Sequence, residues 1–152
     1  MSADNKQLSR RWFEEVWNQR RGESIVKMMT ADAVAHGLSA DGAPMHGPEA
    51  FVRFHQTFTD AFPDLKVYIE DLIAEDDKVV TRWRATGTLK GHGLGVRPTG
   101  RAMEITGITI VRVVNGQFVE GWNNFDVLAM HHQLGTLAEL AASTGPGGSQ
   151  KP

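Results

Sequence analysis

Cysteine is missing from the 152-residue chain, and this absence narrows the chemistry that the protein can use. Without thiols there is no disulfide framework, no thiolate nucleophile and no cysteine-based metal site. A chain of this length can bury one hydrophobic core without such cross-links. We therefore expect one cytoplasmic, redox-indifferent domain over residues 1–142, followed by a disordered tail over residues 143–152.

An excess of charge of one sign and long apolar runs are missing as well. The chain has 16 Lys and Arg against 18 Asp and Glu, which leaves no basic field for the phosphates of nucleic acids. No segment approaches the length of a membrane span, and the charged N-terminal stretch lacks an apolar signal core. We expect neither nucleic acid nor membrane as a partner, and small neutral or anionic molecules remain possible ligands.

Motifs for metals and nucleotide phosphates are also absent. The six histidines do not form a HExxH-type zinc motif, and the glycine-rich segment 91–100 contains neither GxGxxG nor GxxxxGKS. The sequence therefore predicts no bound metal.

The N-terminal half has the apolar spacing of helices. Residues 5–20 carry apolar side chains every three or four positions, which predicts a first helix. Another is predicted between Pro48 and Pro63, with four phenylalanines and His55 on one face. His55 is then either a satisfied core residue or a pocket group.

From residue 65 the pattern changes to the alternation of strands. Four long strands are predicted in two hairpins, and the second turns at Asn115-Gly116, where both residues tolerate positive φ. Helices followed by strands indicate an α+β fold, in which an antiparallel sheet curls around the helices and encloses a pocket.

The last strand, "FVEGWNNFD", places unusual side chains on one face. Strict alternation puts Glu120, Trp122, Asn124 and Asp126 together. If this face lines the pocket, poor solvation raises the pKa of an acid and makes it a better base. If the face is exposed, these are ordinary surface acids. Two alternatives stay open: Asp126 caps the following helix, and Glu120 pairs with an arginine of a neighbouring strand.

Six segments in this order resemble the SnoaL-like polyketide cyclase (ester cyclase) family. They are "HGPEAF", "AFPDLKVYIEDLIAEDDKVVTRWRATGT", "GVRPTGR", "GITIVR", "NGQFVEGW" and "FDVLAMHHQLG". The resemblance implies the cone-shaped fold of the nuclear transport factor 2-like superfamily, with a curved antiparallel sheet around N-terminal helices. It also implies a homodimer and a cofactor-independent enzyme of lyase or isomerase type, which cyclises a polyketide ester by intramolecular aldol condensation.

The resemblance further implies an acid/base on the last strand, helped by a histidine on the strand before it. Glu120 and Asp126 both fit the first role, whereas Thr106 or Gly107 stands where the histidine is expected. His36, at the pocket mouth, is a third catalytic candidate. The candidates for substrate binding are Trp122, Asn124, Trp83, His55, Phe51, Trp12 and Thr106.

Two further functions fit the same scaffold. The pocket acid could activate water in a hydratase, hydrolase or hydroxylase, or the chain could be a non-catalytic module that only binds a small ligand. The lack of a helper histidine favours these two alternatives. For the homodimer, we expect the second copy to cover an outer sheet face that carries Ile105, Val111, Val113 and Val119.

Overall fold

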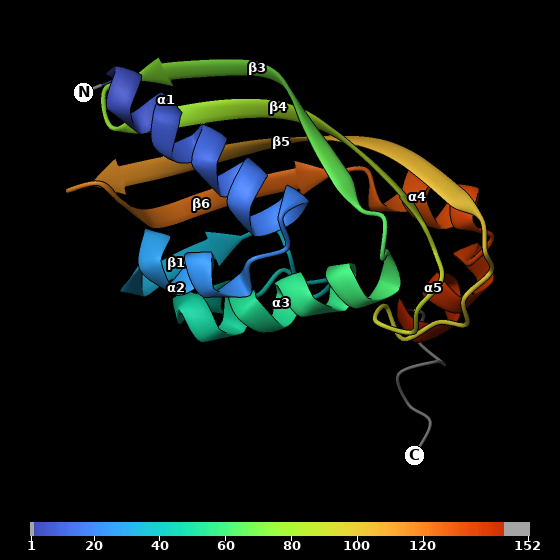
Figure 1. Cartoon of the computed structure of the whole chain (residues 1–152). Coiled ribbons are helices and arrows are strands. Elements are labelled where there is room, and N and C mark those ends of the chain that lie inside the picture. Colours follow the sequence, from blue (N-terminus) through green and yellow to red (C-terminus); the bar gives the residue numbers. More distant parts are fainter. Residues whose placement is uncertain (1, 145–152) are drawn as a thin grey trace.

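The computed structural model describes residues 2–144, which form helices packed on one curved, six-stranded sheet (Figure 1). In chain order the elements are α1 (Ser2–Arg11), the π-helix η1 (Trp12–Asn18), α2 (Gly22–Met28), β1 (Met29–His36), β2 (Met45–His46), α3 (Gly47–Ala61), β3 (Lys66–Glu75), β4 (Lys78–Thr88), β5 (Ala102–Val114), β6 (Gln117–Phe125), α4 (Val127–Leu134) and α5 (Leu137–Thr144). The predicted tail lies outside the described residues from 145 onward.

The strand order is β2-β1-β6-β5-β4-β3. The predicted hairpin between β5 and β6 is confirmed, because Asn115 and Gly116 turn the chain with φ of 51° and 75°. The sheet is not antiparallel throughout, since β1 runs parallel to β6. Helices α1 to α3, with η1, lie on the concave side, and α4 and α5 lie at one end (Figure 1).

A bulge in β6 decides which side chains face the helices. Arg112 pairs with Glu120, but the next residue of β5, Val113, pairs with Phe118, so Val119 is an extra residue. Such an insertion breaks the strict alternation of a strand. Phe118 therefore points inward and is 5% exposed, whereas Glu120 shares the outer face with Arg112.

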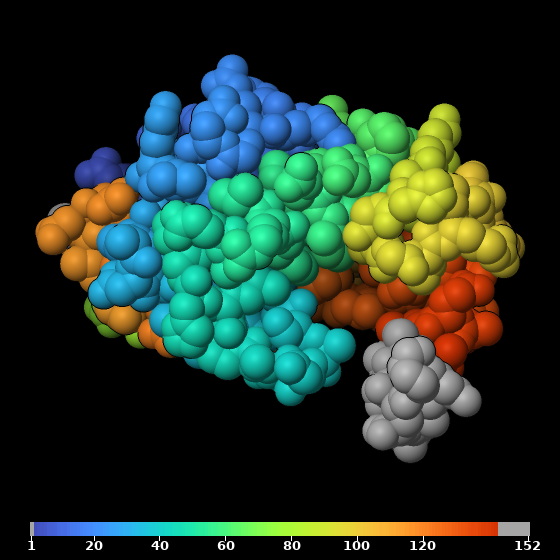
Figure 2. Space-filling model, turned by 90° about the horizontal axis from the view of Figure 1, so that it is seen from below, coloured from blue at the N-terminus to red at the C-terminus, as the bar shows by residue number. Residues whose placement is uncertain are grey.

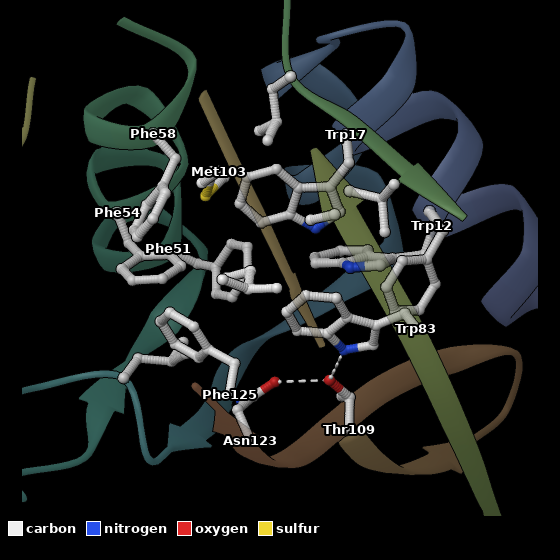
Figure 3. A pocket seen from close by; sticks show the side chains of 16 residues that line it. Trp12, Trp17, Phe51, Phe54, Phe58, Trp83, Met103, Thr109, Asn123 and Phe125 are labelled. Atoms are coloured by element: carbon white, nitrogen blue, oxygen red, sulfur yellow. Dashed lines mark hydrogen bonds between the residues drawn. The ribbon is translucent and has the colours of Figure 1, made fainter. Parts of the chain in front are cut away.

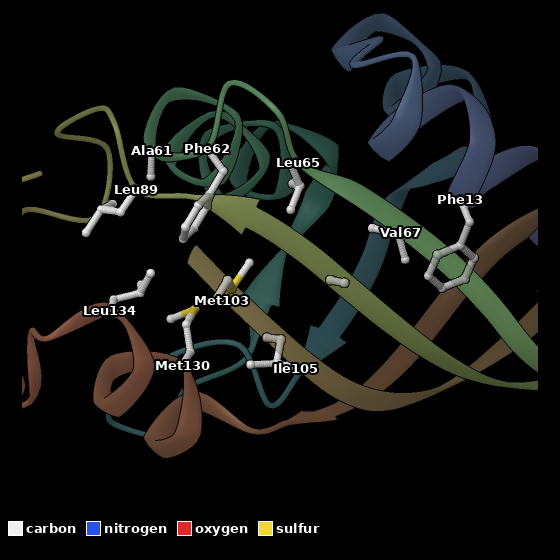
Figure 4. Close-up of a cluster of buried hydrophobic side chains, with 11 residues drawn as sticks. Phe13, Ala61, Phe62, Leu65, Val67, Leu89, Met103, Ile105, Met130 and Leu134 are labelled. Atoms are coloured by element: carbon white, nitrogen blue, oxygen red, sulfur yellow. The ribbon is translucent and has the colours of Figure 1, made fainter. Parts of the chain in front are cut away.

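The hydrophobic core fills the concave side of the sheet in two clusters. The cluster in Figure 4 joins the end of α3, the middle of the sheet and α4, and Phe62 and Leu134 are fully buried in it. The other joins η1, α2, α3 and β1 around Val16 and Ile25. The space between the helices and the middle of the sheet is only partly filled by these side chains.

The convex face carries cross-strand ion pairs and a few exposed apolar side chains. Arg82 bonds Asp71 at 2.6 Å, and Ile108 and Val114 are 46% and 40% exposed. The expectation that Ile105, Val111 and Val113 lie on this face is wrong, because the odd-numbered residues of β5 face the helices. None of the helices within residues 2–144 is long and apolar enough to span a membrane.

Candidate functional site

The concave face of the sheet, η1 and α3 enclose a cavity of about 640 Å³, counting the part open to solvent (Figure 3). Half of its sixteen lining residues are aromatic: Trp12, Phe13, Trp17, Phe51, Phe54, Phe58, Trp83 and Phe125. They come from elements far apart in the sequence, so the fold is needed to assemble them. A mostly apolar, aromatic lining suits contact with the faces of a flat hydrophobic molecule.

The aromatic side chains hold one another in place. Trp12 meets Phe51 with ring centroids 5.2 Å apart at 62°, and Trp17 meets Phe54 at 6.4 Å and 89°. Edge-to-face contacts of this kind are favourable beyond the area that they bury. The surface is hollowed between α3 and the C-terminal helices, with part of β6 visible at its base (Figure 2). The aromatic contacts therefore join η1 and α3 along the cavity wall.

A short chain of hydrogen bonds supplies the polar part of the cavity wall. The indole Nε1 of Trp83 donates to Thr109 Oγ1 at 3.0 Å, and this hydroxyl donates to Asn123 Oδ1 at 3.1 Å (Figure 3). Asn123 Nδ2 in turn donates to the backbone oxygen of His36 at 3.0 Å. We call Trp83, Thr109 and Asn123 the polar relay.

The direction of the polar relay is fixed by its two ends. An indole N–H can only donate, and a backbone carbonyl can only accept. The amide of Asn123 must therefore turn its oxygen to Thr109 and its nitrogen to His36. The bond to His36 uses one of the two N–H bonds of the Asn123 amide, and no hydrogen bond of the second is found within residues 2–144.

The absence of a side chain at Gly107 leaves room for the indole of Trp83. The two residues pair across β4 and β5, and a Cβ at position 107 would lie 2.2 Å from Cζ2 of the indole. The ring thus lies over the backbone of β5, where its N–H reaches Thr109. A side chain at position 107 is excluded as long as Trp83 keeps this position.

The sixteen side chains that line this cavity, all within residues 2–144, include no acid, histidine, lysine, arginine or tyrosine. A smaller adjoining cavity of about 410 Å³ shares Trp12, Phe51, Thr109 and Asn123 with it and reaches Glu120. Among the described residues, no three His, Asp or Glu side chains gather as a metal site would require. The chemistry of the main cavity therefore rests on shape, aromatic contact and neutral hydrogen bonds.

Three of the predicted substrate-binding residues, Trp12, Phe51 and Trp83, line the main cavity. His55 lies behind this wall: it is 4% exposed, and its ring packs against Trp17 with centroids 4.9 Å apart. Thr106 points away from the cavity and is exposed. The structure thus places Trp12, Phe51 and Trp83 on the cavity wall, and it places His55 behind this wall and Thr106 outside it.

The polar residues predicted on the last strand lie on its outer side. Trp122 stacks on His36 with ring centroids 5.8 Å apart, and Asn124 is exposed. The prediction that their face lines the pocket is wrong, because the opposite face, with Asn123 and Phe125, does so. Asp126 accepts a hydrogen bond from the N–H of Ala129 at 3.0 Å, as expected for an N-cap.

Glu120 and His36 form a hydrogen-bonded pair outside the main cavity. His36 Nε2 lies 2.7 Å from Glu120 Oε2, and Arg112 donates to the other carboxylate oxygen at 3.4 Å. The bond from His36 chiefly, and that from Arg112, lower the pKa of Glu120 below its ordinary value. The raised pKa expected for an acid in a poorly solvated pocket is therefore not found here.

Thr109 and Asn123 are the site residues that sequence reasoning missed. Both belong to the odd-numbered face of their strands, together with Ile105 and Phe125. This face is apolar, as expected for a core face, except at these two polar residues. Buried polar side chains on an apolar face are informative, since they need hydrogen-bond partners. This signal was available in the sequence.

Comparison with known proteins places the chain in a family. The model of the SnoaL-like polyketide cyclases matches residues 7–134. A candidate SnoaL-like polyketide cyclase from Jannaschia sp. CCS1 is 26% identical, with a TM-score of 0.80 over 88% of this chain and 93% of its own. AclR from Streptomyces galilaeus, a candidate hydroxylase, is 28% identical, with a TM-score of 0.78 over 90% and 99%.

IdmH from Streptomyces antibioticus, a candidate polyketide cyclase, is 31% identical, with a TM-score of 0.72 over 86% of this chain and 98% of its own. No curated protein matches the chain. These neighbours confirm the predicted α+β fold of the nuclear transport factor 2-like type. The chain belongs to the SnoaL-like polyketide cyclase family.

Proposed function

We propose that the protein binds a flat, hydrophobic carbonyl compound of the polyketide type in its main cavity and promotes intramolecular aldol cyclisation there, without metal or cofactor. The observation that carries this proposal is the aromatic cavity with one directed polar relay in its wall. The aromatic rings supply affinity for a flat substrate and hold its chain in a folded shape.

The polar relay favours an oxygen that accepts a hydrogen bond. The second amide N–H of Asn123 is available to a carbonyl, and the bond from Thr109 keeps the amide in this orientation. When an α-proton leaves, negative charge develops on the neighbouring carbonyl oxygen, and a donor held in place stabilises that charge without reorganising. Asn123 therefore acts as an oxyanion-binding group.

Ring closure also needs a proton acceptor, and the lining of the main cavity supplies none. We infer that solvent or the acidic β-dicarbonyl unit of the substrate itself handles the proton, and that the protein contributes mainly positioning. Holding two reacting carbons in contact removes much of the entropic barrier to cyclisation. The α-proton lost to solvent is returned to the alkoxide that forms, so no oxidant or reductant is consumed.

Two ligands of equal shape test the binding step. Fluorenone is a flat tricyclic ketone, and fluorene has the same rings without the carbonyl. We expect tryptophan fluorescence quenching to show about tenfold tighter binding of fluorenone, the value of one good hydrogen bond. The variant Asn123→Leu should bind both compounds equally. Equal affinity of the wild-type protein for both would contradict the role of the polar relay.

Turnover of an aromatic polyketide ester tests the catalytic step. Under this proposal Glu120→Gln, Asp126→Asn and His36→Gln keep most of the cyclisation rate, because these residues lie outside the main cavity. A large loss in Glu120→Gln would instead identify the Glu120–His36 pair as the acid/base, acting from the smaller cavity that reaches Glu120. Product formation is followed by chromatography.

A second candidate function is binding without catalysis. The specific observation in its favour is that no titratable side chain lines the main cavity within residues 2–144. Fluorenone would then bind as expected, but no polyketide ester would be cyclised faster than in buffer. Water activation, as in a hydroxylase, is a weaker candidate, because this chemistry needs a base beside the substrate.

We also propose a homodimer, in which a second copy covers the apolar part of the convex face. Ile108, Val114 and Ile73 are 46%, 40% and 59% exposed, and Trp122 lies on the same face. Light scattering coupled to size-exclusion chromatography should give twice the mass of the chain. The charge-introducing variant Ile108→Glu should give the monomer.

A further inference from the structure

Trp12 and Trp17 line the same cavity although they are five residues apart in one helical segment. In an α-helix five residues turn through about 500°, so the two side chains would point about 140° apart. In a π-helix, five residues complete about one turn. Gln19 N donates to Glu14 O at 2.8 Å in this i to i+5 pattern. The wider turn of η1 therefore places both indoles on the cavity wall.

His55 of α3 contacts this turn from outside the cavity. Its Nε2 lies 2.6 Å from the backbone oxygen of Val16, which belongs to the last turn of η1, where carbonyls lack partners within the helix. A carbonyl only accepts, so Nε2 carries a proton. Burial lowers the pKa of His55, which favours the neutral ring. The same ring packs against Trp17.

The end of η1 is also held by side chains further along. Asn18 exchanges two hydrogen bonds with the backbone of Val67, at 2.9 and 2.7 Å, and Arg20 donates to the backbone oxygens of Thr59 and Phe62. These contacts fix the helix end to β3 and to the end of α3. His55 differs from them because it contacts both a carbonyl of the π turn and a cavity-lining indole.

We propose that His55 is a positioning residue for the ligand cavity: through its bond to Val16 it holds the π-helical turn that directs Trp12 and Trp17 inward. This inference rests on the proposed function, because it takes the cavity as the ligand site. His55 does not contact the ligand itself. Its effect on binding passes through Trp17.

Two substitutions of His55 separate its hydrogen bond from its bulk. His55→Phe keeps an aromatic ring but removes the donor, and His55→Gln keeps a donor nitrogen at a similar reach. We expect His55→Phe to weaken fluorenone binding about tenfold, and His55→Gln to restore most of the affinity. In a Trp17→Leu background, His55→Phe should have little further effect on binding, since both changes act on the same wall.

His131 is the matched control. It is also buried, at 8% exposed, and makes one side-chain hydrogen bond, from Nδ1 to Thr136 Oγ1 at 2.7 Å, away from the cavity. His131→Phe should lose stability like His55→Phe but bind fluorenone as the wild type does. Equal losses of binding in both variants, or none in His55→Phe, would overturn the inference.

A measurement without ligand distinguishes this inference from the proposed function. The indole N–H resonances of the four tryptophans are observed by NMR and assigned by single substitution. His55→Phe should shift those of Trp12 and Trp17 and leave those of Trp83 and Trp122. If the wild type fails to bind fluorenone but this pattern holds, only the proposed ligand is refuted. Unchanged Trp12 and Trp17 resonances would refute the role of His55.

Discussion

Replacing Gly107 with alanine tests the contact on which the polar relay depends. The added Cβ would lie 2.2 Å from Cζ2 and 2.6 Å from Cε2 of Trp83. Real Cβ atoms do not approach carbon this closely, so the indole must leave its place over β5. It then loses the hydrogen bond from Nε1 to Thr109.

The expected loss of stability is the sum of two effects, the displacement of the indole and the loss of its hydrogen bond. Overpacking a core position costs about 1–3 kcal/mol, and a lost hydrogen bond about 1 kcal/mol more. We therefore expect Gly107→Ala to lower the free energy of unfolding by about 2–4 kcal/mol. In a urea titration this corresponds to a midpoint about 1–2 M lower. A domain of ordinary stability stays folded after such a loss.

Gly121 provides the control within the same sheet. A Cβ at this position would meet Val111 at 3.6 Å, an ordinary contact. Gly121→Ala should therefore change the stability little or raise it by up to about 1 kcal/mol, since glycine is unfavourable in a strand. In a Trp83→Leu background, Gly107→Ala should lower the free energy of unfolding no more than Gly121→Ala does. The same large cost in both backgrounds would refute the reasoning, because the indole would then not be the obstacle.

Three further changes have separate outcomes. Thr109→Val leaves two partly buried polar partners unsatisfied, so urea unfolding should show a loss of about 1–3 kcal/mol, with weaker preference for fluorenone over fluorene. Asp126→Ala removes a helix cap and should cost about 1 kcal/mol by the same assay without changing fluorenone binding. Burial lowers the pKa of His55 and of His131, so the unfolded chain binds more protons below about pH 6.5. Stability that is present above this pH is lost on acidification, so the urea midpoint should be lower at about pH 5.5 than at about pH 7.5. This difference should be smaller in His55→Gln than in the wild type.

The fold was predictable because its signals are local and periodic. Pro48 lies in the first turn of α3, one residue after its start at Gly47, and Asn115 with Gly116 turns the last hairpin. The parallel pairing of β1 with β6 was not predictable in this way. It depends on how the strand meets the edge of the sheet, and no pattern within β1 records its neighbour.

The site was predicted only in part, because two local irregularities change which residues face inward. The extra residue Val119 in β6 shifts the alternation, so Glu120 lies on the outer face although it shares parity with the buried Phe118. The π turn does the same for a helix, since α-helical spacing does not bring Trp12 and Trp17 together. Both irregularities depend on contacts with distant parts of the chain.

The polar relay ends on a main-chain oxygen. The bond therefore restricts the residue type at the next position of the sequence rather than at the position that supplies the oxygen. Any residue at position 36 would offer the same carbonyl to Asn123, so an alanine substitution at position 36 would leave the bond in place. The neighbour is far less replaceable. Gly37 has a φ of 84°, and a Cβ there would lie 2.0 Å from the backbone oxygen of Asn123. This hydrogen bond therefore sets no requirement on the side chain at position 36, whereas position 37 must be glycine.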